Sequence, residues 1–546
     1  MLGEWKNKLF FGDNLNILRD HLRDETVDLT YLDPPFNSNA TYNVLFREKT
    51  GEHSAAQITA FEDTWHWGDE AEGAYHELVT EGPEKLSTLM QSLRSSLGPN
   101  DLMAYLTMMG PRLVELHRVL KQSGSLYLHC DPTASHYLKL QLDAIFGAQN
   151  FLNEVIWKRT GTHSSARRWG PVHDIILCYA KEQGKHTWNR EYTPLDDDHL
   201  KRHYRHVNGD GRRYEHGELT APGTRNGRSG LPWKGFDVTA LGRHWTTTVD
   251  RLDELLAVGR IYLPEDGSWP RLIRYQDESK GRAVGDVWTD IPPINMQARE
   301  RLGYPTQKPE ALLERIIRAS SEEGGVVLDS FCGCGTAVSV AERLNRRWIG
   351  IDITHLAIGL MRHRLHYAFR SELHPYEVIG DPKDLASAET LAKEDRYQFQ
   401  YWALGLVEAR PLHYKKGADQ GIDGLIRFFD DTSGQPKKAV VQVKSGHVNA
   451  GQIRDLKGVI EREKAALGIF VTLERPTKPM LREANSAGFY VPVHFPGLKF
   501  PKIQILTVEA LLEGRQAEYP RMNVATFKKA ERQRKDVNDQ KRLFAT

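Results

Sequence analysis

The feature that most constrains the fold is an apolar strand that runs into a glycine-rich loop and then a helix. Val326–Asp329 is an apolar run ended by an acid, and residues 330–336 read Ser-Phe-Cys-Gly-Cys-Gly-Thr. The glycines let the backbone approach a ligand closely where the next helix begins. The following strand, Arg347–Ile351, ends in Asp352, where an acid can accept ribose hydroxyls. This unit predicts an α/β fold with a nucleoside site at the strand ends.

A second strand ends in the tetrapeptide Asp33-Pro34-Pro35-Phe36, after the β-like run Val27–Leu32. The two prolines stiffen the loop and remove two N–H donors, which leaves acceptors facing a ligand. We expect Asp33 and the Pro34 carbonyl to accept the hydrogens of an amino group, while Phe36 stacks on its ring. An adenine or cytosine extruded from a duplex fits that chemistry. An ordinary strand-ending turn is the alternative.

Short apolar strands alternate with helices through most of the first 385 residues, which predicts a mostly parallel sheet. Strands are expected near 9–11, 27–32, 125–130, 154–157 and 175–179, and helices near 15–22, 101–123, 135–146 and 311–320. Gly124 is expected to end the helix that starts at Asp101. Residues 50–100 show no clean period. No Gly-x-Gly-x-x-Gly or phosphate-loop motif occurs, so neither a dinucleotide nor a motor ATPase is expected.

Length and composition set broad limits. A chain of 546 residues predicts two or three domains, and its net charge of +1 neither favours nor excludes nucleic acid. No apolar run is long enough to cross a membrane, and the first residues lack signal-peptide character. Cys332 and Cys334 form a Cys-x-Cys pair, but Cys130 and Cys178 lie far away and show no paired spacing. The four cysteines therefore predict small buried residues in a reducing compartment, and a cytoplasmic protein without a zinc site is expected.

Residues 185–290 differ from their surroundings. They are dense in Arg, His, Trp and Gly, as in Lys201–His206 and Arg225–Arg228. Basic residues interleaved with aromatic ones suit phosphate contact and base-edge contact in DNA. A solvated, charged insert is the alternative.

Beyond residue 390 a second α/β pattern begins. Asp423 precedes the strand Leu425–Phe429, and Gln442 and Lys444 lie on one face of the strand 438–445. Asp423 and the Gln442 amide oxygen are ligands that suit Mg²⁺, and Lys444 could orient water for attack on phosphorus. An amphipathic hairpin with solvated charges is the alternative. Residues 523–546 form a basic tail.

The first set of motifs resembles the amino-methyltransferases of DNA. The resemblance is carried by Asp33–Phe36, by Phe331–Thr336 and by Thr306-Gln307-Lys308-Pro309, in the order typical of the β class. It implies S-adenosylmethionine as cofactor, double-stranded DNA as partner and 185–290 as the target-recognition insert. Asp rather than Ser before the prolines favours adenine N6 over cytosine N4. Members of the family often pair, so a homodimer is an expectation.

The resemblance also assigns roles to residues. The catalytic set is Asp33, Pro34, Pro35 and Phe36. The cofactor set is Thr306, Gln307, Lys308, Asp329, Phe331, Gly333, Gly335, Thr336 and Asp352. Asp352 is expected to bind the ribose, and Phe331, Gly333, Gly335 and Thr336 to line the methionine side. Asp329 takes the cofactor amino group or simply ends its strand.

The C-terminal pattern resembles Mrr-type restriction endonucleases, a branch of the PD-(D/E)xK fold. Asp423, Gln442 and Lys444 match its Gly-x-Asp-Gly and Gln-x-Lys motifs, with Asp423 and Gln442 as the expected Mg²⁺ ligands. Gln442 replaces the usual Glu, which removes one charge from the metal site.

Together these resemblances predict a Rossmann-like methyltransferase with a recognition insert and a C-terminal restriction-endonuclease-like domain. The expected boundaries are 1–184 and 291–385 for the two methyltransferase halves, 185–290 for the insert, 390–522 for the nuclease-like domain and 523–546 for the tail. The expected function is restriction–modification: methylation of adenine together with Mg²⁺-dependent DNA cleavage. The alternatives are an inactive, DNA-binding nuclease-like domain, a cytosine N4 or RNA acceptor, and a DNA-binding regulator.

Overall fold

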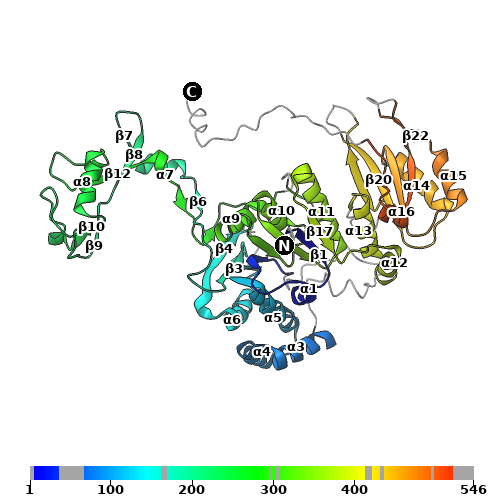
Figure 1. Cartoon of the computed structure of the whole chain (residues 1–546), viewed down its shortest axis with the longest axis horizontal. Coiled ribbons are helices and arrows are strands. Elements are labelled where there is room, and N and C mark those ends of the chain that lie inside the picture. The colour runs from blue at the N-terminus through cyan, green and yellow to red at the C-terminus, as the bar shows by residue number, and fades with distance from the viewer. Residues whose placement is uncertain are drawn as a thin grey trace. The chain divides into compact units, whose positions relative to one another are not determined.

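The computed structural model describes residues 5–35, 67–161, 169–295, 298, 300–302, 307–411, 421–430, 436–492 and 497–520. It divides into two compact units, one of Met1–Asn189 with Asp286–Thr546 and one of Arg190–Gly285 (Figure 1). Phe36 and Thr306, together with the basic tail, lie outside the described residues. No described helix is long and apolar enough to cross a membrane.

The larger unit contains a mixed sheet whose order is β14-β4-β5-β3-β2-β15-β16-β1-β17. Its strands are β1 (Asn7–Phe11), β2 (Val27–Leu32), β3 (Leu120–Cys130), β4 (Phe151–Lys158), β5 (His173–Ala180), β14 (Val287–Trp288), β15 (Val326–Asp329), β16 (Arg347–Asp352) and β17 (Tyr376–Ile379). Only β5 runs antiparallel to its neighbours in the described ladder. The predicted α/β sheet with mostly parallel strands is confirmed.

Helices flank this sheet (Figure 1). They are α1 (Asn14–His21), α5 (Asp101–Val119), α6 (Ser135–Phe146), α9 (Glu310–Ser320), α10 (Thr336–Arg343) and α11 (His355–Phe369). Helices α3 (Asp69–Glu81) and α4 (Glu84–Leu97) pack against α5 and α6. One large hydrophobic cluster joins α5 and α6 to the central strands. It fixes the carboxyl ends of β2 and β15, where the predicted site lies.

Two local expectations were wrong. Helix α5 ends at Val119, and Gly124 lies inside β3 instead of ending the helix. A Cβ at Gly124 would come within 3.1 Å of the Asp28 carbonyl oxygen, so the glycine permits close strand packing. Residues 50–100, expected to lack a regular pattern, contain α3 and α4. Helix α4 buries Leu86, Met90 and Leu93 at the spacing of one helix face.

The unit Arg190–Gly285 has its own small core, formed by two tryptophans and four aliphatic residues: Leu219, Trp233, Val238, Trp245, Leu252 and Ile261. A four-stranded sheet has the order β11 (Ile261–Tyr262), β12 (Arg271–Tyr275), β8 (Arg213–Gly217), β7 (His206–Val207). The remaining elements are β6 (Tyr192–Thr193), α7 (Asp197–His203), β9 (Thr220–Pro222), β10 (Arg243–Trp245), α8 (Val249–Ala257) and β13 (Arg282–Ala283).

The C-terminal region forms a five-stranded sheet of order β18 (Arg410–Pro411), β19 (Gly424–Phe428), β20 (Lys437–Lys444), β21 (Leu467–Thr472), β24 (Ile503–Thr507). Its other elements are α12 (Leu385–Glu394), α13 (Arg396–Leu406), α14 (Ala450–Arg462), α15 (Lys478–Ser486), β22 (Phe489–Tyr490), β23 (Phe500–Pro501) and α16 (Val508–Leu512). Val440 and Val441, adjacent on β20, belong to different hydrophobic clusters, so both sheet faces are covered. The expected C-terminal α/β domain is confirmed.

Candidate active site

The two predicted motifs meet at one edge of the sheet because β2 and β15 are adjacent parallel strands. Tyr31 is paired with Asp329 in the ladder, so Asp33 and the loop after Asp329 leave the same edge side by side. Parallel strands place their carboxyl ends together, and ligands bind there in open α/β sheets. The structure thus brings the Asp-Pro-Pro segment and the glycine loop together across nearly 300 residues of sequence.

Lys308 joins the third motif to this edge. Its ammonium donates to both carboxylate oxygens of Asp33, at 2.7 and 2.6 Å, and both side chains are mostly buried. Gln307 makes hydrogen bonds only a few residues away along the chain. Its amide nitrogen donates to the Glu300 carbonyl, and its amide oxygen accepts from the Leu302 N–H. The two neighbouring residues therefore have different tasks, since only Lys308 contacts the Asp-Pro-Pro segment.

The glycine loop is a tight turn. Gly333 and Gly335 both have positive φ angles, of 49° and 73°. The Gly333 N–H donates to the Asp352 carboxylate at 2.9 Å, and the other Asp352 oxygen accepts from the N–H and hydroxyl of Thr354. Helix α10 begins at Thr336, and the Thr336 hydroxyl accepts a hydrogen bond from the Arg364 guanidinium at 3.1 Å. These hydrogen bonds hold the loop in one conformation. Phe331, within the loop, packs against the large hydrophobic cluster.

Three carboxylates face the same edge. Burial raises the pKa of Asp329, and the charges of Asp33 and Asp352 raise it further. Burial likewise raises the pKa of Asp352, to about 6, against four hydrogen bonds that lower it. Lys308 supplies one positive charge among them. A cationic ligand at this edge would favour the ionised forms of Asp329 and Asp352.

A buried polar network behind Asp33 was not predicted from the sequence. The Tyr31 hydroxyl lies 3.0 Å from Nδ1 of His129, and Nε2 of His129 lies 3.1 Å from Oδ2 of Asp174. The three side chains come from adjacent strands β2, β3 and β5. The only sequence signal was polar residues inside otherwise apolar strands, which is compatible with any buried hydrogen bond.

The unit Arg190–Gly285 contains an aromatic face on its four-stranded sheet. Ladder register places His206 opposite Tyr214 and Ile273 opposite His216, so the rings share one side. The rings of His206 and His216 stack at 4.2 Å, and those of His216 and Tyr262 at 4.7 Å. Tyr262 is 42% exposed. Stacked, accessible rings of this kind suit contact with bases.

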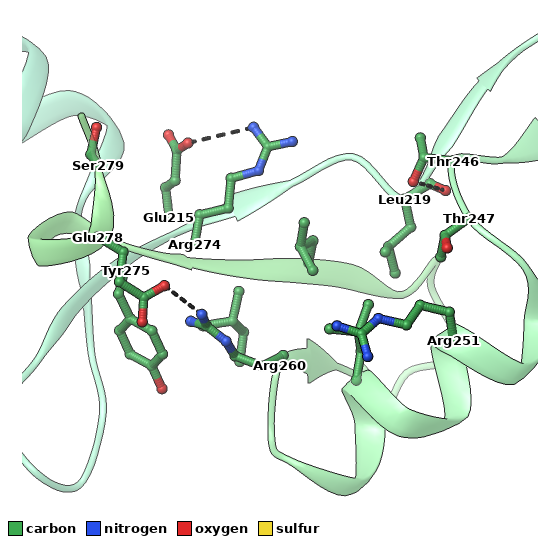
Figure 2. Close-up of a pocket in the computed structure, with 13 residues that line it drawn as sticks. Glu215, Leu219, Thr246, Thr247, Arg251, Arg260, Arg274, Tyr275, Glu278 and Ser279 are labelled. Atoms are coloured by element: carbon green, nitrogen blue, oxygen red, sulfur yellow. Dashed lines mark hydrogen bonds and ion pairs between the residues drawn. The ribbon is translucent and has the colours of Figure 1, made fainter. Parts of the chain in front are cut away.

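The same unit has a pocket of about 570 Å³ (Figure 2). Arg251, Arg260 and Arg274 line it (Figure 2), together with apolar side chains that include Leu255 and Leu272. Each arginine has an acidic neighbour: Arg251 pairs with Glu254, Arg260 with Glu278 and Arg274 with Glu215. The pocket is therefore polar at its rim and close to neutral in charge.

In the C-terminal domain, the three predicted residues lie on or beside β19 and β20. The Asp423 carboxylate accepts the Val443 N–H at 2.7 Å, and the Gln442 amide nitrogen donates to the Gly421 carbonyl oxygen. No group of three His, Cys, Asp or Glu side chains suited to a metal ion occurs among the described residues. Mg²⁺ prefers several oxygen ligands, with one or two carboxylates. This donor set, with a buried glutamine where a carboxylate is usual, does not fit Mg²⁺.

Comparison with known families gives two matches. Residues 27–360 match a family described as "DNA methylase" of the N6/N4 type, and residues 398–513 match one described as "NACHT-associated inactive Restriction Endonuclease 1". The chain thus combines a methyltransferase domain with a restriction-endonuclease-like domain. The second description does not support the expected nuclease activity or its Mg²⁺.

Curated relatives agree with the first match. Type II methyltransferase M.EcaI of Enterobacter cloacae is 30% identical over 348 residues, which cover 63% of this chain and 66% of that protein. The Mod subunit of the type III restriction-modification enzyme StyLTI of Salmonella typhimurium is 28% identical over 357 residues, covering 62% and 50%. The chain therefore spans between half and two thirds of the length of these relatives.

Among solved structures, PvuII DNA methyltransferase (cytosine-N4-specific) aligns with 66% of this chain and 86% of its own at 13% identity. The TM-score is 0.33, and an alignment this loose adds nothing to the family assignment. The match over residues 27–360 covers more than half of the 546 residues. On that ground the chain belongs to the N6/N4 DNA methylase family.

Proposed function

We propose that this protein transfers a methyl group from S-adenosylmethionine to the exocyclic N6 of adenine in double-stranded DNA. The observation that carries the proposal is the shared sheet edge, where Asp33 at the end of β2 lies one strand from the glycine loop after β15. A base acceptor and a cofactor loop on neighbouring strands bring the two reactants together without large motion.

The residues at this edge fit the cofactor. S-adenosylmethionine carries a sulfonium and an ammonium group, and these positive charges would favour the ionised forms of the buried acids Asp329 and Asp352. The Ser330 hydroxyl is buried without a hydrogen-bond partner in the described part of the chain. We assign Asp352 to the ribose and Asp329 to the cofactor's amino group. We assign the loop 331–336 to the methionine side, and Gln307 and Lys308 to the segment that closes the cofactor site.

The chain's own residues supply orientation. The exocyclic amine is a weak nucleophile because its lone pair is delocalised into the ring. Hydrogen bonds to Asp33 and to the Pro34 carbonyl turn that pair toward the methyl donor, and Phe36 stacks on the extruded base. The cofactor supplies an activated methyl group when bound. The ion pair with Lys308 keeps the Asp33 carboxylate oriented before DNA binds. When the target base enters, its amine shares this carboxylate with Lys308.

Adenine is favoured over cytosine by the residue before the prolines, which is Asp33 rather than serine. One relative, YhdJ of Escherichia coli, is described as a DNA adenine methyltransferase and is 26% identical over 258 residues. The test is to incubate the protein with unmodified DNA and methyl-labelled cofactor, digest the DNA to nucleosides and separate them. Label in N6-methyl-2′-deoxyadenosine supports the proposal, whereas label in N4-methyl-2′-deoxycytidine replaces it with the alternative acceptor.

We assign target recognition to the unit Arg190–Gly285, through its aromatic face. Replacing the exposed rings of His206 and Tyr262 by alanine is expected to weaken duplex binding by at least about 30-fold, because each base stacked on a ring contributes roughly 1–3 kcal/mol. Fluorescence anisotropy with a labelled duplex measures this loss. Val258→Ala is the matched control, since Val258 is 71% exposed in the same unit and lies off this face. Unchanged affinity in the double variant would remove the assignment.

We propose that the C-terminal domain contacts DNA without cutting it. Its matched family is described as inactive, and Gln442 is tied to the Gly421 carbonyl. Supercoiled plasmid incubated with the protein and Mg²⁺ is therefore expected to stay intact, with or without cofactor. Cleavage that disappears in Asp423→Ala would instead restore the expected endonuclease and complete a restriction–modification pair in one chain.

A further inference from the structure

A chain of buried polar groups crosses the sheet just behind Asp33. It starts at the Tyr31 hydroxyl on β2, passes through His129 on β3 and ends at Asp174 on β5. Arg159, which follows β4, approaches the Asp174 carboxylate at 3.1 Å. His129 is 0% exposed and Asp174 and Tyr31 are each 2% exposed. Polar groups buried this deeply are costly unless they are paired, so the network holds its members in one arrangement.

The charge states of Asp174 and His129 determine which atoms of the network donate hydrogen bonds. Burial alone would raise the pKa of Asp174, but its hydrogen bond with His129 and the charge of Arg159 lower it, so this carboxylate only accepts. Burial lowers the pKa of His129, and the Lys308 ammonium lowers it further, which keeps the imidazole neutral. Nε2 must therefore carry the hydrogen, and Nδ1 must accept from Tyr31.

The direction of the hydrogen bond from Tyr31 to His129 matters because Tyr31 lies two residues before Asp33. Burial raises the pKa of Tyr31, and Asp33 is the charge that raises it most, so the hydroxyl stays protonated near that carboxylate. A tyrosine hydroxyl has a single hydrogen to donate. As long as His129 takes it, the hydroxyl does not donate to Asp33.

Backbone hydrogen bonds of the sheet cannot fix the orientation of the Asp33 carboxylate. The ladder between β2 and β3 has its last paired residues at Leu32 and Leu128. Pro34 and Pro35 have no N–H groups with which to extend it. The orientation of Asp33 therefore depends on side-chain contacts, of which Lys308 is one.

We propose that His129 and Asp174 are positioning residues for methyl transfer. They hold the Tyr31 hydroxyl hydrogen on His129, so that this hydroxyl does not compete with the amino group of the target base for the Asp33 carboxylate, which already accepts from Lys308. This inference rests on the proposed function and adds to it a buried hydrogen-bond network that acts on Asp33 through Tyr31. Neither residue contacts substrate or cofactor.

The test replaces His129 by leucine and by glutamine. His129→Leu removes the acceptor, so Tyr31 turns to Asp33 and kcat is expected to fall about 100-fold, the cost of misplacing a reacting group. His129→Gln keeps an amide oxygen that accepts and an N–H that donates, and is expected to retain kcat within about threefold. KM for DNA and Kd for the cofactor, measured by calorimetry, are expected to stay unchanged in both.

Tyr127→Phe is the matched control. Tyr127 lies on the same strand and the same sheet face as His129, and its buried hydroxyl lies 2.7 Å from the Ser320 hydroxyl in α9. Equal losses of kcat in His129→Leu and Tyr127→Phe, or an unchanged kcat in a folded His129→Leu, would overturn the inference. Absence of methyl transfer by the unmodified protein would instead overturn the proposed function on which it rests, so the two failures are distinguishable. Circular dichroism establishes that each variant is folded.

Discussion

Replacing Asp33 by alanine is expected to lower kcat for DNA methylation about 1,000-fold, because the acceptor that orients the exocyclic amine is lost. The same change leaves the Lys308 ammonium without its carboxylate partner. Binding of the cofactor is expected to weaken only modestly, since Asp329 and Asp352 remain. Single-turnover transfer of a labelled methyl group measures kcat directly, and calorimetry measures cofactor binding.

Asp24→Ala provides the matched control for this prediction. Asp24 precedes the same strand β2, and its side chain is 73% exposed and paired with Arg118 at the surface. Removing it tests the general effect of losing one carboxylate near the sheet. If Asp33→Ala and Asp24→Ala retain similar kcat values, Asp33 is not the base acceptor.

Gly335→Val is expected to destabilise the cofactor loop strongly. Gly335 has a φ of 73°, which costs an L residue roughly 1–2 kcal/mol. A Cβ there would also lie 2.4 Å from Cγ of Met361 on α11, an overlap that costs about 1–3 kcal/mol more. We expect a lower free energy of unfolding and loss of cofactor binding, measured by urea denaturation and calorimetry.

Gly324→Val separates the two causes. Gly324 has nearly the same φ, 75°, but nothing lies within 4 Å of an added Cβ. Its loss of stability is expected to reflect backbone strain alone and to be smaller than that of Gly335→Val. Equal losses in the two variants would show that contact with Met361 contributes nothing at the loop.

The sheet was predictable because its strands carry strong local signals. Val326–Asp329 is an uninterrupted apolar run ended by an acid, and it forms β15 as expected. Helix α4 was missed although Leu86, Met90 and Leu93 repeat at helical spacing, because exposed polar residues surround them. Gly124 was misassigned because the same residue type ends helices and permits close strand packing, and only tertiary contacts distinguish the two.

The site was predictable at the level of motifs and not of contacts. Asp33 and Lys308 are 275 residues apart, so no local rule announces their ion pair. The bond between Tyr31 and His129 depends on β2 lying beside β3, which a single sequence does not specify. In the C-terminal domain, the spacing of Gln442 and Lys444 predicted a restriction-endonuclease-like domain, which the family match supports, but the Mrr-type branch is not confirmed. The bond from Gln442 to Gly421 required coordinates.

The most direct test of the account is a crystal structure of the protein with S-adenosylmethionine and a duplex that contains its target. The account predicts that the sulfonium lies at the edge shared by β2 and β15, with its methyl group aimed at an extruded adenine whose amino group contacts the Asp33 carboxylate. A cofactor bound at another edge, or a target base held away from Asp33, would contradict it.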